Sequence, residues 1–121
     1  MIPERPPPVH VLLLANGTHR TRLPLARLLA AGCLIDDRRS DTDGVATART
    51  LRPDVVLMDL PEGSRGALDL CRELQADAVT RSIPIIAITG NPAIGQFMMA
   101  LGVKPCTDVS LHAEVLRLLA N

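Results

Sequence analysis

Short runs of aliphatic residues alternate along this chain with segments that carry helical signals. The runs Val9–Leu14, Val55–Met58 and Ile83–Ile88 are apolar at most positions and lack a strict polar–apolar alternation. Such runs are typical of strands that are buried on both faces of a sheet. Because parallel strands need long crossovers and helical segments separate these runs, the pattern predicts an α/β domain. Its parallel sheet should lie between two layers of helices.

Helices are expected where apolar residues recur every three to four positions. The expected helices span Leu23–Ala31, Val45–Leu51, Ala67–Ala76, Ile94–Leu101 and Leu111–Ala120. Gly32 and Gly102 follow two of them at the position where a left-handed residue ends a helix. Pro53 stops another, because proline cannot continue a helix. Ser110 suits the N-cap of the last helix.

One face of the fourth expected helix carries Ile94, Phe97, Met98 and Leu101. We expect the pair Met98-Met99 to pack in the core, with an adaptable contact surface as the alternative.

The second strand is expected to be short, over Cys33–Ile35, and to lead into the polar stretch from Asp36 to Gly44. We expect this stretch to be a solvated turn that contains Asp36, Asp37, Asp41 and Asp43. A supply of substitute acids for a site is the alternative. The three histidines, His10, His19 and His112, are far apart in sequence and are expected to be partly exposed and non-catalytic.

The 121 residues suffice for one domain, with the proline-rich residues 1–8 as an extended tail and residues 9–121 as the folded unit. Basic and acidic residues are equal in number, so the chain has no basic footprint for nucleic acid. Phe97 is the single aromatic residue, which argues against a stacking platform for bases.

The cysteines, at positions 33, 71 and 106, are odd in number and widely spaced. This spacing argues against a zinc site and against a disulfide framework. No apolar run has the length of a membrane span, and the N-terminus lacks the apolar core of a signal peptide. We therefore expect a cytoplasmic protein with reduced thiols.

Three polar residues stand just past expected strands: Asn16, Asp59 and Thr89. In doubly wound sheets the functional crevice lies at the carboxyl ends of the strands, so these positions are candidates for a site. An acid that follows a buried run must be solvated or bound to something. Asp59 is therefore either a capping, solvent-facing carboxylate or a nucleophile or metal ligand in that crevice.

The segment Arg52–Leu60 resembles the segment that carries the phospho-acceptor in response-regulator receiver domains, and Ile83–Gly90 is similar to the family's fourth strand with its switch threonine. The resemblance covers about residues 9–121. It implies a flavodoxin-like (βα)5 doubly wound parallel sheet with strand order 2-1-3-4-5. It also implies that Asp59 is the phospho-acceptor and that Thr89 moves onto the phosphoryl oxygens. In that family Mg²⁺ and a lysine neutralise the charge of phosphoryl transfer.

The chain departs from the family where the family binds its metal. The family has two acids after the first strand, and this chain has Ala15 and Asn16 there. The resemblance leaves Asp59, the side-chain carbonyl of Asn16 and the backbone carbonyl of Pro61 as the possible Mg²⁺ ligands. Because Asn16 brings no charge and Ala15 brings no ligand, we expect Mg²⁺ to bind weakly if it binds.

The family's pocket lysine has two possible positions in this chain. Lys104-Pro105 resembles the family's Lys-Pro pair, but this register leaves a crossover that is short for a parallel connection. The helical periodicity up to Leu101 favours a register in which strand five is Cys106–Val109. In that register Val109 takes the lysine position, and Cys106 takes the position of the family's aromatic switch residue.

Two functions follow from the resemblance. In the first, a histidine kinase or phosphotransfer protein phosphorylates Asp59, and Thr89 couples the change to the final helices. In the second, the chain is a pseudo-receiver, a protein-interaction module whose state is set by binding or dimerisation. The missing acids favour the second function, because a conformational switch needs different interactions in its two states.

Neither function is enzymatic, and neither involves direct contact with nucleic acid or membrane. The resemblance implies that a homodimer would form through the last two helices. A flavodoxin-like domain that binds a small molecule is a third possibility, although no cofactor motif supports it. A stand-alone protein and a domain of a longer chain both agree with the sequence.

Overall fold

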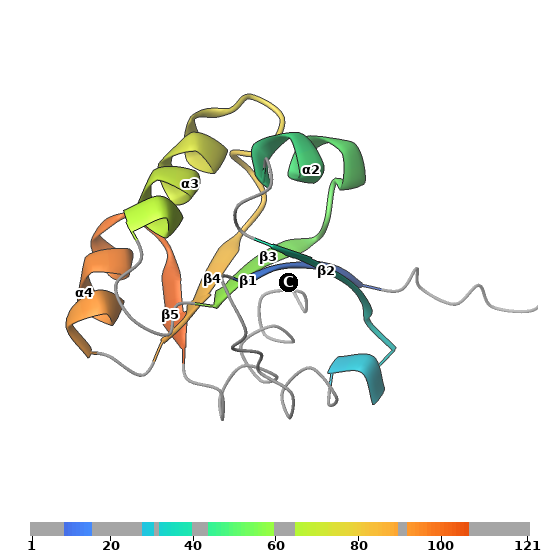
Figure 1. Cartoon of the computed structure of the whole chain (residues 1–121), viewed down its shortest axis with the longest axis horizontal. Coiled ribbons are helices and arrows are strands. Elements are labelled where there is room, and N and C mark those ends of the chain that lie inside the picture. The colour runs from blue at the N-terminus through green and yellow to red at the C-terminus, as the bar shows by residue number, and fades with distance from the viewer. Residues whose placement is uncertain are drawn as a thin grey trace, which may run out of the picture.

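The computed structural model of the protein describes residues 9–15, 28–30, 32–39, 44–59, 65–89 and 92–106. From the second strand onward, strands and helices alternate along these residues (Figure 1). In chain order the elements are β1 (His10–Ala15), β2 (Leu34–Arg39), α2 (Gly44–Leu51), β3 (Val55–Asp59), α3 (Arg65–Ala76), β4 (Ile85–Ile88), α4 (Pro92–Ala100) and β5 (Lys104–Cys106). The expected tail at residues 1–8 and the expected helix Leu111–Ala120 lie outside the described residues.

The strands form one parallel sheet in the order β2-β1-β3-β4-β5. The α/β fold class and the strand order implied by the resemblance are thereby confirmed. From β1 the chain first moves outward to β2 and then returns to place β3 on the other side of β1. This reversal makes the carboxyl ends of β1 and β3 the switch point at which such sheets place their sites.

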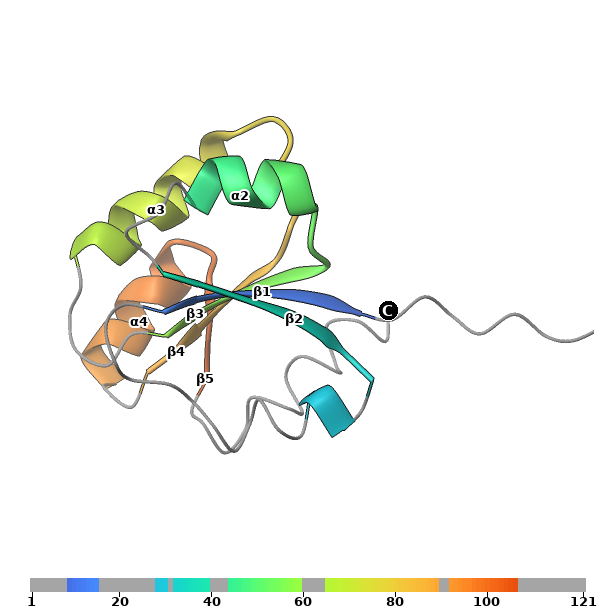
Figure 2. The ribbon, with the colours of Figure 1, turned by 45° about the vertical axis from the view of Figure 1, so that its right-hand side comes forward.

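Alternate positions of the strands feed two apolar cores, one on each face of the sheet. The first core joins the sheet to α2, α3 and α4 through the side chains Leu12, Leu14, Val56, Met58, Ala48, Leu74 and Met98. The second contains Val11, Leu13, Val55, Leu57, Ile86, Ile88 and Leu28. Figure 2 shows α2, α3 and α4 on one side of the sheet and the helical turn of residues 28–30 on the other. Burial on both faces explains why the central strands are continuous apolar runs.

Two glycines end helical segments as predicted. Gly32 and Gly102 have φ angles of +93° and +81°, in the left-handed region that glycine adopts without steric cost. After Gly102, the amide of Val103 donates to the Met98 carbonyl at 2.9 Å, and the amide of Gly102 itself donates to the Met99 carbonyl at 3.0 Å. This is the Schellman arrangement, and the buried side chains of Val103 and Met98 pack in the same core.

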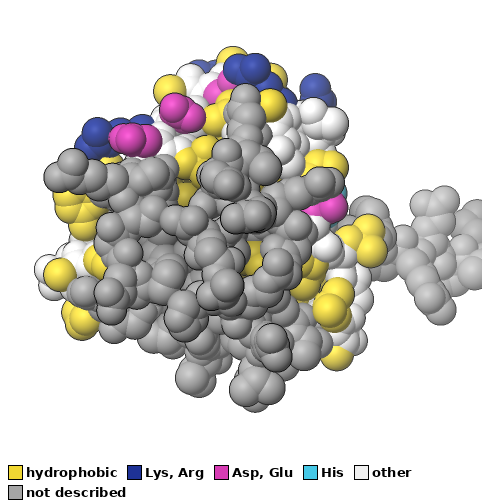
Figure 3. All heavy atoms as spheres, in the orientation of Figure 1, with side chains coloured by type: hydrophobic (Ala, Val, Ile, Leu, Met, Phe, Trp, Pro, Cys, Tyr) yellow, Lys and Arg dark blue, Asp and Glu magenta, His cyan; other side chains and the backbone are white. Residues whose placement is uncertain are grey.

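The segment between α3 and β4 is organised around Asp77. Its Oδ1 accepts hydrogen bonds from the amides of Val79 and Thr80 at 2.8 and 3.2 Å, and its Oδ2 accepts one from Arg49 Nε on α2 at 2.6 Å. The buried hydroxyl of Thr80 donates to the Leu74 carbonyl at 2.7 Å. Asp77 therefore ties α2 to the turn that leads into β4. Acidic and basic side chains are interspersed over this part of the surface (Figure 3).

The second strand was expected over Cys33–Ile35 and is longer in the structure, where β2 spans Leu34–Arg39. The strand extends to Arg39 and includes Asp36 and Asp37, which were expected in a solvated turn. A polar half-strand is tolerated because β2 is the outermost strand, so one side of it is not enclosed by the sheet. Asp41 and Asp43 lie outside the described residues.

The start of β5 and the exposure of Phe97 also differ from expectation. β5 begins at Lys104, two residues before Cys106, and contains Pro105. Proline is acceptable there because an edge strand has one side on which no ladder hydrogen bond is required. Phe97 is 47% exposed, although it was placed on the same helix face as the buried Met98.

Candidate functional site

The carboxyl ends of β1, β3 and β4 bring three positions to one edge of the sheet. Ala15 is the register partner of Asp59, and Asp59 pairs on its other side with Ile88. Thr89 follows Ile88 directly and is 8% exposed. Asp59 and Thr89 are distant in sequence but lie at the ends of neighbouring strands, at the switch point of the sheet.

Local sequence explains why Asp59 stands at the end of its strand. The four residues before it are apolar, and each is at most 1% exposed. A carboxyl group could not follow them into the core without a compensating partner. The apolar run therefore places the acid at the strand's end. The predicted roles of Asp59 and Thr89 in phosphorylation, and those of Asn16 and Pro61, which lie outside the described residues, stay predictions.

Among the residues that end the five described strands, Asp59 is the one acid that could contribute to a Mg²⁺ site. Mg²⁺ is a hard cation that proteins hold with carboxylates and other oxygens. The β1 neighbour of Asp59 is Ala15, whose side chain carries no oxygen. In the part of the chain that the structure describes, no group of three or more His, Cys, Asp or Glu residues could hold a metal ion.

The backbone register places Lys104 away from this edge. Lys104 is the first residue of β5 and pairs with Ile86, which in turn pairs with Leu57. Leu57 comes two residues before Asp59, so Lys104 lies about 7 Å short of Asp59 along the strands. Lys104 is also exposed. Its role as the pocket lysine stays a prediction, and this register argues against it.

Cys106, by contrast, is level with the end of β4. It pairs with Ile88, one residue before Thr89, and is the last residue of β5, whereas the preferred register had it as the first residue of that strand. Val109, the residue at the lysine position in that register, lies outside the described residues.

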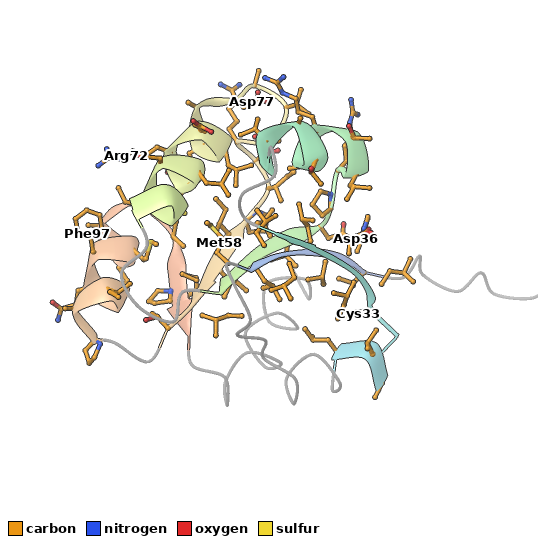
Figure 4. All side chains as sticks on the ribbon, viewed as in Figure 1. Cys33, Asp36, Met58, Arg72, Asp77 and Phe97 are labelled. Carbon is orange, nitrogen blue, oxygen red and sulfur yellow. The ribbon has the colours of Figure 1, made fainter. Side chains whose placement is uncertain are left out.

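The two described cysteine side chains are buried free thiols, as expected. The thiol of Cys71 donates to the Met58 sulfur at 3.1 Å, and burial raises the pKa of Cys71 to about 11. Burial also raises the pKa of Cys33. Figure 4 shows Met58 on the helix-covered side of the sheet and Cys33 on the other side. Because the thiolate is the reactive form, neither group is suited to nucleophilic chemistry.

His10 lies at the opposite end of β1 from the candidate site. Its Nε2 is 2.5 Å from Oδ2 of Asp36, and its backbone amide donates to Oδ2 of Asp54 at 2.8 Å. These contacts join β1 to β2 and to the residue that precedes β3. The expectation of a partly exposed histidine is confirmed.

The sequence did not predict an exposed apolar surface on α4. Met98 is buried, but Met99 is 64% exposed and Phe97 is 47% exposed. Figure 4 shows Phe97 on the outer side of α4. A shallow groove of about 460 Å³ is lined by Met99 together with Gly102, Val103, Lys104 and Pro105. The alternative of a contact surface at the Met98-Met99 pair was the signal that pointed here: Met98 packs in the core as expected, whereas Met99 is exposed.

The chain is similar in sequence to two known proteins. The chain is 28% identical to the response regulator PleD of Caulobacter vibrioides over 112 residues, which are 87% of this chain and 25% of PleD. It is 47% identical to the protein PilH of Pseudomonas aeruginosa over 47 residues, which are 39% of each chain. No family model matches the chain.

A solved structure has the same fold over nearly the whole chain. It is the receiver domain of a sensor histidine kinase from Pseudomonas aeruginosa PAO1, with a magnesium ion coordinated in its active site cleft. The TM-score is 0.76 at 21% identity, over 94% of this chain and 99% of that one. The chain has the receiver-domain fold, and its resemblance to response regulators is confirmed.

These relatives support a role of the receiver domain in signal transduction. The chain spans a quarter of the length of PleD and 39% of that of PilH, so their complete activities do not transfer to it. Among the described residues, no helix has both the length and the apolar character needed to span a bilayer.

Proposed function

We propose that this receiver domain is a pseudo-receiver, a protein-interaction module in which Mg²⁺-dependent phosphorylation of Asp59 is impaired. The observation that carries the proposal is the register pair between Asp59 and Ala15. The resemblance implies an acid at the position next to Asp59 on β1. With alanine there, the site loses a negative ligand for the cation that neutralises phosphoryl transfer.

The energetics of switching support the same proposal. Moving a two-state equilibrium from 1:99 to 99:1 requires about 5.5 kcal/mol of differential binding. In a working receiver the phosphoryl group and its Mg²⁺ supply that difference. A site with fewer charged ligands supplies less, so the conformational state of this domain would depend on its protein partners.

The exposed apolar surface of α4 supports a protein partner. Phe97 and Met99 are both exposed on this helix, and Met99 lines the groove together with Lys104 and Pro105. Methionine and aromatic residues are enriched where proteins contact one another. We propose that a signalling protein binds this surface, and that the domain itself catalyses no reaction.

A second candidate function is a phosphorelay receiver that takes its phosphoryl group from a histidine kinase or phosphotransfer protein. The observation that favours it is the placement of Asp59 and Thr89 at the ends of neighbouring strands. The two functions differ in how strongly the site binds Mg²⁺.

A Mg²⁺ titration followed by the amide NMR spectrum separates them. We expect no saturable shift around Asp59 and Thr89 in the parent chain, and a saturable shift in the double variant Ala15→Asp/Asn16→Asp. Adding Asp59→Asn to the double variant should abolish that shift. Ala100→Asp, which adds an acid at an exposed position of α4, is the matched control and should behave as the parent does. Saturation of the parent at the same Mg²⁺ concentration as the double variant would overturn the proposal.

A further inference from the structure

The outer side of β2 is an edge of the sheet. β2 pairs with β1 along one side, and among the described residues no strand pairs with its other side. The Leu34 amide donates to the Val9 carbonyl at 2.7 Å and so points toward β1. Because peptide groups alternate along a strand, the amides and carbonyls of Ile35, Asp37 and Arg39 point toward the outer side. Such a row of groups is a template for another strand.

The charge pattern of β2 restricts which strand can pair with its outer side. Its last four residues read Asp36-Asp37-Arg38-Arg39. Charges of one sign on an edge repel a second copy and protect the edge. Here the sign reverses in the middle of the run. A parallel copy in register would meet like charges at all four positions, whereas an antiparallel copy can place Asp36 opposite Arg38.

Symmetry restricts the register of such a pair. A two-fold axis perpendicular to the sheet keeps each position on its own face, so opposed positions must differ by an even number. The register that opposes Asp37 to its own copy pairs residues 35–39 wholly within β2. Asp36 then lies opposite Arg38 of the other copy, and this pair occurs twice. At the axis the two copies of Asp37 face each other as like charges, and Arg39 of the other copy lies diagonal to each of them. The two Asp36–Arg38 attractions outnumber this one repulsion.

Two exposed leucines stand near the beginning of β2. Leu34 is 55% exposed and Leu29, in the helical turn before the strand, is 57% exposed. Figure 1 shows that turn next to the start of β2. Exposed leucines at a sheet edge gain from being covered, because burial removes apolar surface from water. The edge thus combines backbone groups, complementary charges and apolar side chains.

We propose that β2 pairs with β2 of a second copy of this chain in antiparallel orientation, which joins two sheets into one. The surface is distinct from α4, and β1 separates its Arg39 end from Asp59, because Ala15 pairs with Arg39 on one side and with Asp59 on the other. The dimer therefore does not depend on phosphorylation, and its failure would leave the pseudo-receiver proposal untouched.

Sedimentation velocity at low salt and rising protein concentration tests the pairing. The parent should self-associate, and Arg38→Asp should weaken the dimer by about tenfold or more, because two facing attractions become repulsions. Asp36→Arg should weaken it similarly. An equimolar mixture of the two variants should regain association, since each then faces the opposite charge. Circular dichroism verifies that both variants are folded, which matters for Asp36→Arg because it removes the contact with His10.

Arg72→Asp is the matched control, because it makes the same charge change at an exposed position on α3 (Figure 4). It should associate as the parent does. A monomeric parent, or a mixture that fails to regain association, would overturn the pairing. An Arg38→Asp chain that associates as tightly as the parent would also overturn the pairing. That result would favour a dimer through the last two helices.

Discussion

Ala15 and Asp59 are register partners at the carboxyl ends of β1 and β3, and the neighbour of Asp59 on its other side is Ile88. Both ladder neighbours of the candidate phospho-acceptor are therefore apolar. An acid flanked in this way receives no second carboxylate from the sheet for binding a hard cation. The pseudo-receiver proposal rests on this arrangement.

The left-handed glycine after α4 should contribute to stability. Gly102→Ala should lower the free energy of unfolding by about 1–2 kcal/mol, because an L-residue pays that cost in the left-handed region. Gly95→Ala is the control within the same helix. A Cβ at Gly95 would lie 3.5 Å from Cβ of Pro105, an ordinary contact, so this change should raise stability by about 0.5–1 kcal/mol. Urea unfolding of both variants checks the opposite signs, and equal effects would contradict the account.

The carboxylate of Asp77 should make stability depend on acid pH. Its hydrogen bond with Arg49, helped by the amides of Val79 and Thr80, lowers the pKa of Asp77 from 3.8 to about 2. A lowered pKa in the folded state means that the contribution is complete above about pH 4 and disappears as the pH falls through about 2.

Asp77→Asn isolates that contribution. The difference in unfolding free energy between parent and variant should be constant from neutral pH to about pH 4 and should shrink toward about pH 2. Chemical denaturation at a series of pH values measures it. A difference that does not change with pH would show that the negative charge of the carboxylate adds nothing to the stability that its hydrogen bonds provide.

Cys71 should react with thiol reagents only when the protein opens. It is fully buried, and its pKa is raised to about 11, so at pH 8 it is a protonated thiol without access to solvent. Peptide mapping after brief labelling should find Cys71 unmodified in the native protein and modified in urea. Labelling in the native state at the rate of a free peptide thiol would contradict the burial of this residue.

Much of the fold was predictable from the sequence because the central strands are buried on both faces. Val55–Met58 is apolar for that reason, and this apolar run predicts both the strand and the place where it ends. The polar half of β2 was missed because an edge strand needs no apolar pattern on its outer side. Phe97 was misplaced because helix periodicity shows which residues share a face, but not where the covered part of that face ends.

For the site, the sequence could predict positions but not their surroundings. Asp59 and Thr89 were found because polar residues directly after buried strands stand at the carboxyl edge of a parallel sheet. The start of β5 at Lys104 was not predictable, since Lys-Pro-Cys has no strand pattern and pairs only because β4 lies beside it. The exposed surface of Met99 depended in the same way on how α4 packs.

The most direct measurement is the intact mass of the protein after incubation with a small phosphodonor and Mg²⁺. The account predicts no stoichiometric gain of a phosphoryl group by the parent chain. It predicts a gain in the Ala15→Asp/Asn16→Asp variant, lost again when Asp59→Asn is added. A stoichiometric gain by the parent that disappears in Asp59→Asn would contradict the account and establish a working receiver.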